Sequence, residues 1–161
     1  MSQSTNDQSL REHVLYVLRG EGAHITFDDF VADFPVARCG EPVAGLPYTA
    51  WQVLEHMRIA LWDILEFSRD SKHVSPKWPE GYWPPKEQVG TPELWNETVT
   101  KFGDDLKQMQ DLVADTATDL LAKIPYGTGQ TILREALLVA DHNSYHLGVL
   151  VAMGRTLQST A

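Results

Sequence analysis

Apolar side chains recur at intervals of three and four residues in four stretches of this 161-residue chain. This spacing is typical of amphipathic α-helices, because residues three and four apart share one helix face. We expect long helices over residues 9–19, 50–69, 92–114 and 132–153. The 50–69 stretch is apolar on two sides, which indicates a central helix. No stretch alternates apolar and polar residues convincingly, so the pattern predicts an all-α protein.

Threonines mark the expected helix starts. Thr26, Thr49, Thr91 and Thr131 each precede a helical segment, and a threonine hydroxyl can accept a hydrogen bond from a free N–H of the first turn. Gln52 stands three residues after Thr49 and completes a capping box. The segment after Thr26 is short, so it adds one minor helical element to the four long helices.

Three connections between the expected helices are long. Residues 35–48, 71–90 and 120–130 hold prolines and glycines, which interrupt helices. The 71–90 connection also holds Trp78, Tyr82 and Trp83, and we expect these aromatic side chains to pack on the bundle rather than to bind a ligand. The predicted fold class is therefore an all-α four-helix bundle with long connections, in a single domain over residues 1–161.

Charge and composition restrict the partners. A net charge of -9 argues against binding to nucleic acid and to anionic membrane surfaces, because their phosphates would be repelled. No apolar run approaches the roughly 18 residues of a membrane span. The first residues are polar and lack the basic start and apolar run of a signal peptide. We therefore expect a cytoplasmic protein.

Cysteine chemistry is limited to one residue. Cys39 is the only cysteine, so the chain can form neither an internal disulfide nor a zinc cluster of thiolates. Arg38 is the only nearby residue in sequence that would lower the pKa of its thiol, and no base accompanies it. We expect Cys39 to be inert.

The most informative feature is a pair of histidines in the last expected helix. His142 and His146 are one helical turn apart, so both imidazoles lie on one face, close enough to bind one ion. His56 lies on the inner face of the 50–69 helix. An isolated inward histidine is usually a hydrogen-bonded core residue, but three unpartnered imidazoles in one core would be costly. Three neutral imidazoles with an open fourth position suit a catalytic zinc or nickel site.

The histidine pair does not indicate a protease. Its spacing is that of the His-Glu-x-x-His zinc motif, but position 143 is Asn, so the usual general base is missing. Asp63 and Glu135 lie two helical turns along the histidine faces and could orient the ligands. Glu55 and Asp141 adjoin ligands in sequence but point about 100° away on an ideal helix. For all four carboxylates we favour a surface charge or salt bridge over a role at the site.

Three further histidines are weaker candidates. They are His13, His24 and His73. His24 lies just before a capped segment and could line the end of the bundle. His73 stands at the polar start of the 71–90 connection, where we expect it to be solvated.

The segments that carry these histidines, WQVLEH at 51–56 and DHNSYHLG at 141–148, resemble the DinB-like/YfiT-like family of metalloenzymes. This is the damage-inducible bundle family, not the DNA polymerase that shares the name, and the resemblance extends from about Leu10 to Leu157. It implies a four-helix bundle with one divalent ion, typically zinc or nickel, held by His56, His142 and His146 with water in the open position. It also implies a homodimer. Some members use low-molecular-weight thiols such as bacillithiol or mycothiol, and many have no assigned reaction.

Two classes of function fit these features. The first is a metal-dependent enzyme, a hydrolase or a thiol S-transferase, in which the ion lowers the pKa of a bound water or thiol. The second is a non-catalytic bundle that binds a metal or, in a stress response, a small molecule. Structural zinc sites usually have four protein ligands and catalytic sites three, so the ligand count favours the enzyme. A metal-free bundle with a small-molecule pocket is a third alternative. The sequence assigns a catalytic role to no residue, and no motif in it identifies a substrate.

Overall fold

Four long helices and one short helix make up the regular structure of residues 3–159, the part of the chain that the computed structural model describes. In chain order they are α1 (Gln3–Leu18), α2 (Phe27–Asp33), α3 (Ala50–Arg69), α4 (Pro92–Ala114) and α5 (Ile132–Ser159), with single 3₁₀ turns η1 (Val36–Arg38) and η2 (Glu80–Tyr82). The predicted all-α class is confirmed. The domain expected over residues 1–161 includes residues 1, 2, 160 and 161, which lie outside the described residues.

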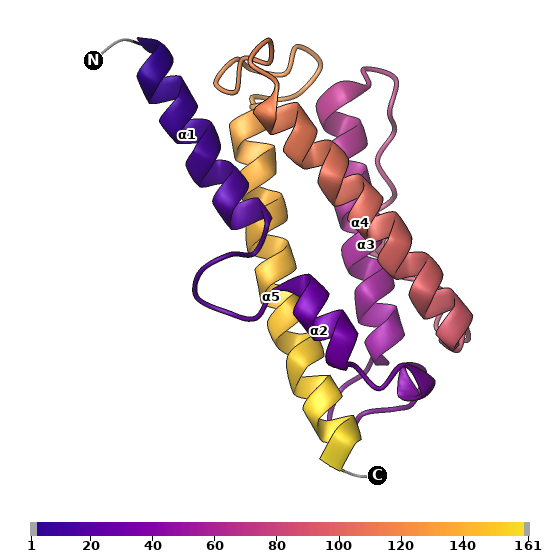
Figure 1. The fold of residues 1–161 in the computed structure, drawn as a ribbon. Helices are drawn as coiled ribbons and strands as arrows, with labels where there is room; N and C mark the ends of the chain where they lie inside the picture. Colours follow the sequence, from indigo (N-terminus) through magenta and orange to yellow (C-terminus); the bar gives the residue numbers. More distant parts are fainter. Residues whose placement is uncertain (1–2, 160–161) are drawn as a thin grey trace.

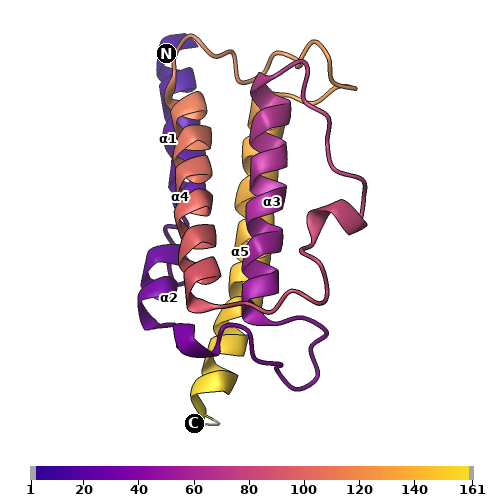
Figure 2. The ribbon, with the colours of Figure 1, turned by 90° about the vertical axis from the view of Figure 1, so that its right-hand side faces the viewer.

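The long helices run side by side and enclose one core (Figures 1 and 2). Both α3 and α1 pack against α4 and α5, while α2 continues below α1 at the other end of the bundle. The core consists of fully buried side chains, among them Leu54, Met57, Leu61 and Leu65 of α3, Phe102 and Met109 of α4, and Leu150 and Met153 of α5. Among residues 3–159, no helix combines the length and the apolar content that crossing a bilayer requires.

The helices begin where the threonines predict. The hydroxyls of Thr26, Thr49 and Thr91 each accept a first-turn N–H, and Thr49 forms the complete capping box with Gln52. The Thr131 hydroxyl accepts from the Arg134 N–H at 3.1 Å. Local side-chain chemistry therefore determines these boundaries.

Two helices are longer than predicted, and the inner face of α1 differs from the expected one. α1 begins at Gln3 and α5 continues to Ser159. The first turn of α1 is polar and gives no apolar signal, whereas the end of α5 still contributes the buried Leu157 to the core. On α1, the spacing of three and four residues would place His13 and Val17 on the inner face beside Val14, but both are exposed, while the charged Arg11 is 7% exposed. The inward face of α1 therefore contains a cation that apolar periodicity does not reveal.

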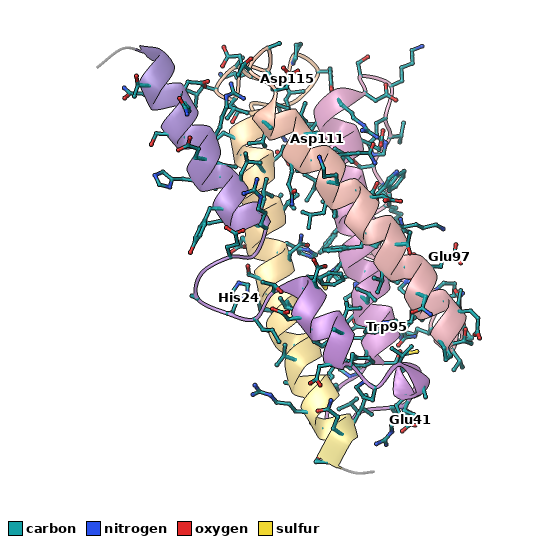
Figure 3. The ribbon with its side chains drawn as sticks, viewed as in Figure 1. His24, Glu41, Trp95, Glu97, Asp111 and Asp115 are labelled. Carbon is teal, nitrogen blue, oxygen red and sulfur yellow. The ribbon has the colours of Figure 1, made fainter. Side chains whose placement is uncertain are left out.

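Arg11 closes the carboxyl end of α4, where Asp115 is labelled in Figure 3. Its guanidinium donates to the carbonyl oxygens of Val113 (2.7 Å), Asp115 (3.0 Å) and Thr118 (2.7 Å). It also pairs with Asp7 one turn earlier on α1, at 2.8 Å. The last carbonyls of a helix have no partner within the helix and carry partial negative charge, so one buried cation satisfies several of them together.

Two connections cross at the opposite end of the bundle. A Cβ atom at Gly40 would lie 2.2 Å from the Gly90 carbonyl oxygen, and one at Gly90 would lie 2.4 Å from Cβ of Trp51. The Trp51 N–H in turn donates to the Cys39 carbonyl at 2.9 Å. Only glycines allow such close approach, so the 35–48 and 71–90 connections pack against the start of α3.

The substitution Arg11→Met should lower the free energy of unfolding by about 2–4 kcal/mol, because it leaves three carbonyls without their charged donor. Urea denaturation followed by circular dichroism measures this loss. The matched control is Arg19→Met, at an exposed position of the same chain segment, which should change stability by less than about 0.5 kcal/mol. Equal effects of the two substitutions would contradict the proposed role of Arg11.

Candidate metal centre

Three imidazoles converge between α3 and α5. His56 comes from α3, and His142 and His146 come from adjacent turns of α5. One ring nitrogen of each histidine lies within 4.8 Å of those of the other two. The predicted convergence of these side chains is thus present, and it depends on the packing of α3 against α5.

Hydrogen bonding determines which nitrogen of His56 is available. Its Nδ1 lies 2.8 Å from the carbonyl oxygen of Tyr82, and because a carbonyl only accepts, Nδ1 carries the proton. The neutral ring then presents a lone pair at Nε2, which lies 3.2 Å from Nε2 of His142. Two nitrogens bound to one tetrahedral ion at 2.0–2.1 Å would be about 3.3 Å apart. The donor set, and the spacing of this pair, therefore fit a single divalent ion.

Burial keeps these imidazoles neutral. It is the main cause that lowers the pKa of His142 to about 4, with further contributions from His146 and His56. Burial and the proximity of His56 likewise lower the pKa of His146 to about 4. The pKa of His56 is also lowered by burial, although its bond to the Tyr82 carbonyl acts in the opposite direction. Neutral imidazole is the form that binds a metal ion.

The 71–90 connection holds His56 from outside the bundle. Figure 2 shows this segment running along the outer side of α3. The Trp83 ring stacks on His56 with centroids 4.0 Å apart and planes 2° from parallel, and Tyr48 stacks on Trp83 at 3.9 Å. The expectation that the aromatic residues pack on the bundle is confirmed for Tyr82 and Trp83 but is wrong for Trp78, which is 69% exposed.

His73 is not solvated, contrary to the prediction. Its side chain is 8% exposed, its Nε2 donates to Oδ1 of Asp63 at 2.7 Å, and its ring meets the edge of Trp62. The prediction failed because the partner carboxylate belongs to α3, ten residues earlier in the chain. His73 nevertheless lies outside the three-histidine cluster.

The two carboxylates on the histidine faces are buried. Asp63 is 7% and Glu135 3% exposed, so neither is a surface charge. The other half of the expectation, a salt bridge, is confirmed for Glu135, and Asp63 is paired with His73. Asp63 accepts from His73 and from the Tyr82 hydroxyl at 2.6 Å, and Glu135 pairs with Arg134 at 2.7 Å. Neither has a described hydrogen bond to the three clustered histidines, so any effect on those rings passes through other residues.

The remaining candidates lie away from the cluster. Glu55 is paired with Arg58 and accepts from Thr98 of α4, and Asp141 is exposed. His24 is exposed, with Nε2 3.2 Å from Oγ of Ser144 on α5 (Figure 3). The expectation that Glu55 and Asp141 point away from the site is confirmed.

A cavity of about 410 Å³ opens beside the cluster, between α3, α5 and the 71–90 connection. His56 and His142 form part of its lining, Ile64, Phe67 and Leu138 contribute apolar walls, and Asp63, Tyr82 and Glu135 contribute polar groups. A small apolar pocket with a few polar groups is typical of a small-molecule site. His56 and His142 thus line a space that a small ligand can enter.

Cys39 contributes no nucleophile to this cavity. Its side chain is fully buried and burial raises the pKa of its thiol. A thiol that stays protonated is unreactive, in agreement with the expectation of an inert residue.

A helical bundle in which three neutral histidines converge beside a cavity is compatible with metal binding. Residues 19–150 match the family model described as the DinB superfamily, so the chain belongs to the DinB superfamily. The match begins directly after α1 and ends within α5. No curated protein and no solved structure matches the chain significantly.

Proposed function

We propose that this protein is a metal-dependent enzyme whose ion is held by His56, His142 and His146. The observation that carries the proposal is the convergence of three ring nitrogens beside a cavity of about 410 Å³. Within residues 3–159 the cluster has three members. Three protein ligands leave one position of a tetrahedral ion for a substrate or water, whereas structural zinc sites are usually closed by four.

Zinc or nickel suits this all-imidazole donor set. A bound divalent ion would supply Lewis acidity and lower the pKa of a water or thiol at its open position. The chain's own part is to keep the three imidazoles neutral, to exclude bulk water by burial, and to bind the substrate against Ile64 and Leu138. Hydrolysis and the transfer of a low-molecular-weight thiol to an electrophile are the reactions we propose.

The second candidate is a non-catalytic bundle that binds a metal or a small molecule. Asn143 stands where the helical zinc motif of proteases has its glutamate, so the pair of histidines lacks an adjacent general base. If all coordination positions of the ion were filled, the ion would not act on a substrate, and the cavity would serve only to bind a small molecule. Activity measurements distinguish the two candidates.

We expect the untagged protein to bind about one zinc or nickel ion per chain after reconstitution. His56→Ala, His142→Ala and His146→Ala should each weaken binding at least about tenfold, because each removes a nitrogen ligand. The matched control is His13→Ala on the exposed face of α1. Isothermal titration gives stoichiometry and affinity, and wild-type protein that binds no divalent ion stoichiometrically would refute the proposal.

Metal-loaded protein should turn over substrates from panels of esters or electrophiles, with small thiols added to half of the assays. His142→Ala should lose this activity, and Cys39→Ser should keep it, because the buried thiol cannot reach the cavity as a thiolate. Activity that survives in His142→Ala but disappears in Cys39→Ser would overturn the metal-centred mechanism.

We further propose a homodimer, and the cytoplasmic location expected from the sequence stays a prediction. Support for the dimer comes from family membership and from Leu137 and Tyr145, large side chains of α5 that are exposed. Light scattering at micromolar concentration should give twice the mass of one chain. A monomer mass over the whole concentration range would contradict the dimer.

A further inference from the structure

Tyr82 is bound to α3 at two separate points. Its backbone carbonyl accepts the Nδ1 proton of His56 at 2.8 Å, and its side-chain hydroxyl donates to Oδ2 of Asp63 at 2.6 Å. His56 and Asp63 are seven residues apart, about 10.5 Å along the helix. One residue of the 71–90 connection therefore spans two turns of α3, and the position of its carbonyl depends on where its hydroxyl is held.

Asp63 also holds a second part of the same connection. Its Oδ1 accepts from His73 at 2.7 Å, and the side chains of His73 and Asp63 are 8% and 10% exposed. Between His73 and Trp83, the described hydrogen bonds from the connection to the bundle go to Asp63 and His56. A buried carboxylate with charge-assisted bonds to two partners is a strong anchor.

The orientation of His56 depends on this anchored segment. The Tyr82 carbonyl selects the protonated nitrogen and directs Nε2 towards His142, and the next residue, Trp83, stacks on the imidazole. In metal sites, such outer contacts determine ring orientation and ligand basicity. A shift of the segment would therefore move both contacts at once.

We propose that Asp63 is a positioning residue for the metal site, acting on His56 through Tyr82. The proposal rests on the function proposed above, because it assumes that His56 is a ligand. It assigns to a carboxylate that touches no ligand histidine a role in metal affinity and coordination geometry. It also assigns a role to the 71–90 connection, which holds a ligand in place.

Cobalt(II) is the probe, because its visible absorption reports coordination geometry independently of activity. Tyr82→Phe deletes only the hydroxyl and keeps the carbonyl, and Asp63→Ala deletes the anchor. Both should weaken cobalt binding about tenfold and alter the visible spectrum. The double variant should bind cobalt as tightly as whichever single variant binds it less tightly, since both changes break the same connection. Asp63→Asn retains an oxygen for the Tyr82 hydroxyl and should restore most of the affinity.

Two controls separate positioning from general loss of stability. Glu55→Ala removes a half-buried carboxylate from the same helix, but its partners are Arg58 and Thr98, away from the cluster. Tyr126→Phe removes a hydroxyl from a tyrosine that packs on Phe67. Both should leave the cobalt affinity and spectrum unchanged, even where the melting temperature falls.

An unchanged cobalt affinity and spectrum in Tyr82→Phe would overturn the inference while leaving the proposed function intact. An equal change in Glu55→Ala would also overturn it, because the effect would then follow from stability alone. Should Asp63→Ala fail to fold, Tyr82→Phe and Asp63→Asn still decide the question. Wild-type protein that binds no cobalt would overturn the proposed function and this inference with it.

Discussion

Three imidazoles lie between α3 and α5, where water has restricted access and each ring nitrogen needs a partner. Burial lowers the pKa of His142 and His146 to about 4, so the rings are neutral and each offers an unprotonated nitrogen. Unpartnered polar groups in such a place are costly. Packing of α3 against α5, together with the 71–90 connection, brings the available nitrogens of the three rings close to one another, where one ion could bind all of them.

The connection is as much a part of the site as the helices. Long loops without regular structure usually have a function, and here the loop supplies a carbonyl acceptor and a stacking partner to His56. The same loop forms one side of the cavity through Tyr82. A ligand in the cavity would thus lie against the residue whose carbonyl holds a candidate metal ligand.

Buried charges serve different purposes at different places in this bundle. Arg11 satisfies helix-end carbonyls far from the histidines, whereas Asp63 ties the loop to α3 next to them. Each buried charge has several partners with good geometry, which is the condition under which such groups are tolerated. Apolar periodicity treats every charged residue as a surface residue, so it did not reveal the burial of Arg11. It placed Asp63 on the face of His56 but did not identify the loop residues that Asp63 binds.

The sequence by itself determined the helical class, the helix starts and the histidine pair. Thr49 and Gln52 act on their own first turn, and His142 and His146 share a face because of helix geometry, so local rules suffice for both. The sequence indicated only that His56 faces inward. Its position beside His142 and His146 results from the packing of α3 on α5. Only the tertiary structure decided that His73 is buried on Asp63 and that the Tyr82 carbonyl orients His56. Those contacts join a loop to a helix across 10 and 26 residues of chain, and no short-range pattern encodes which loop residue will lie against which helix turn.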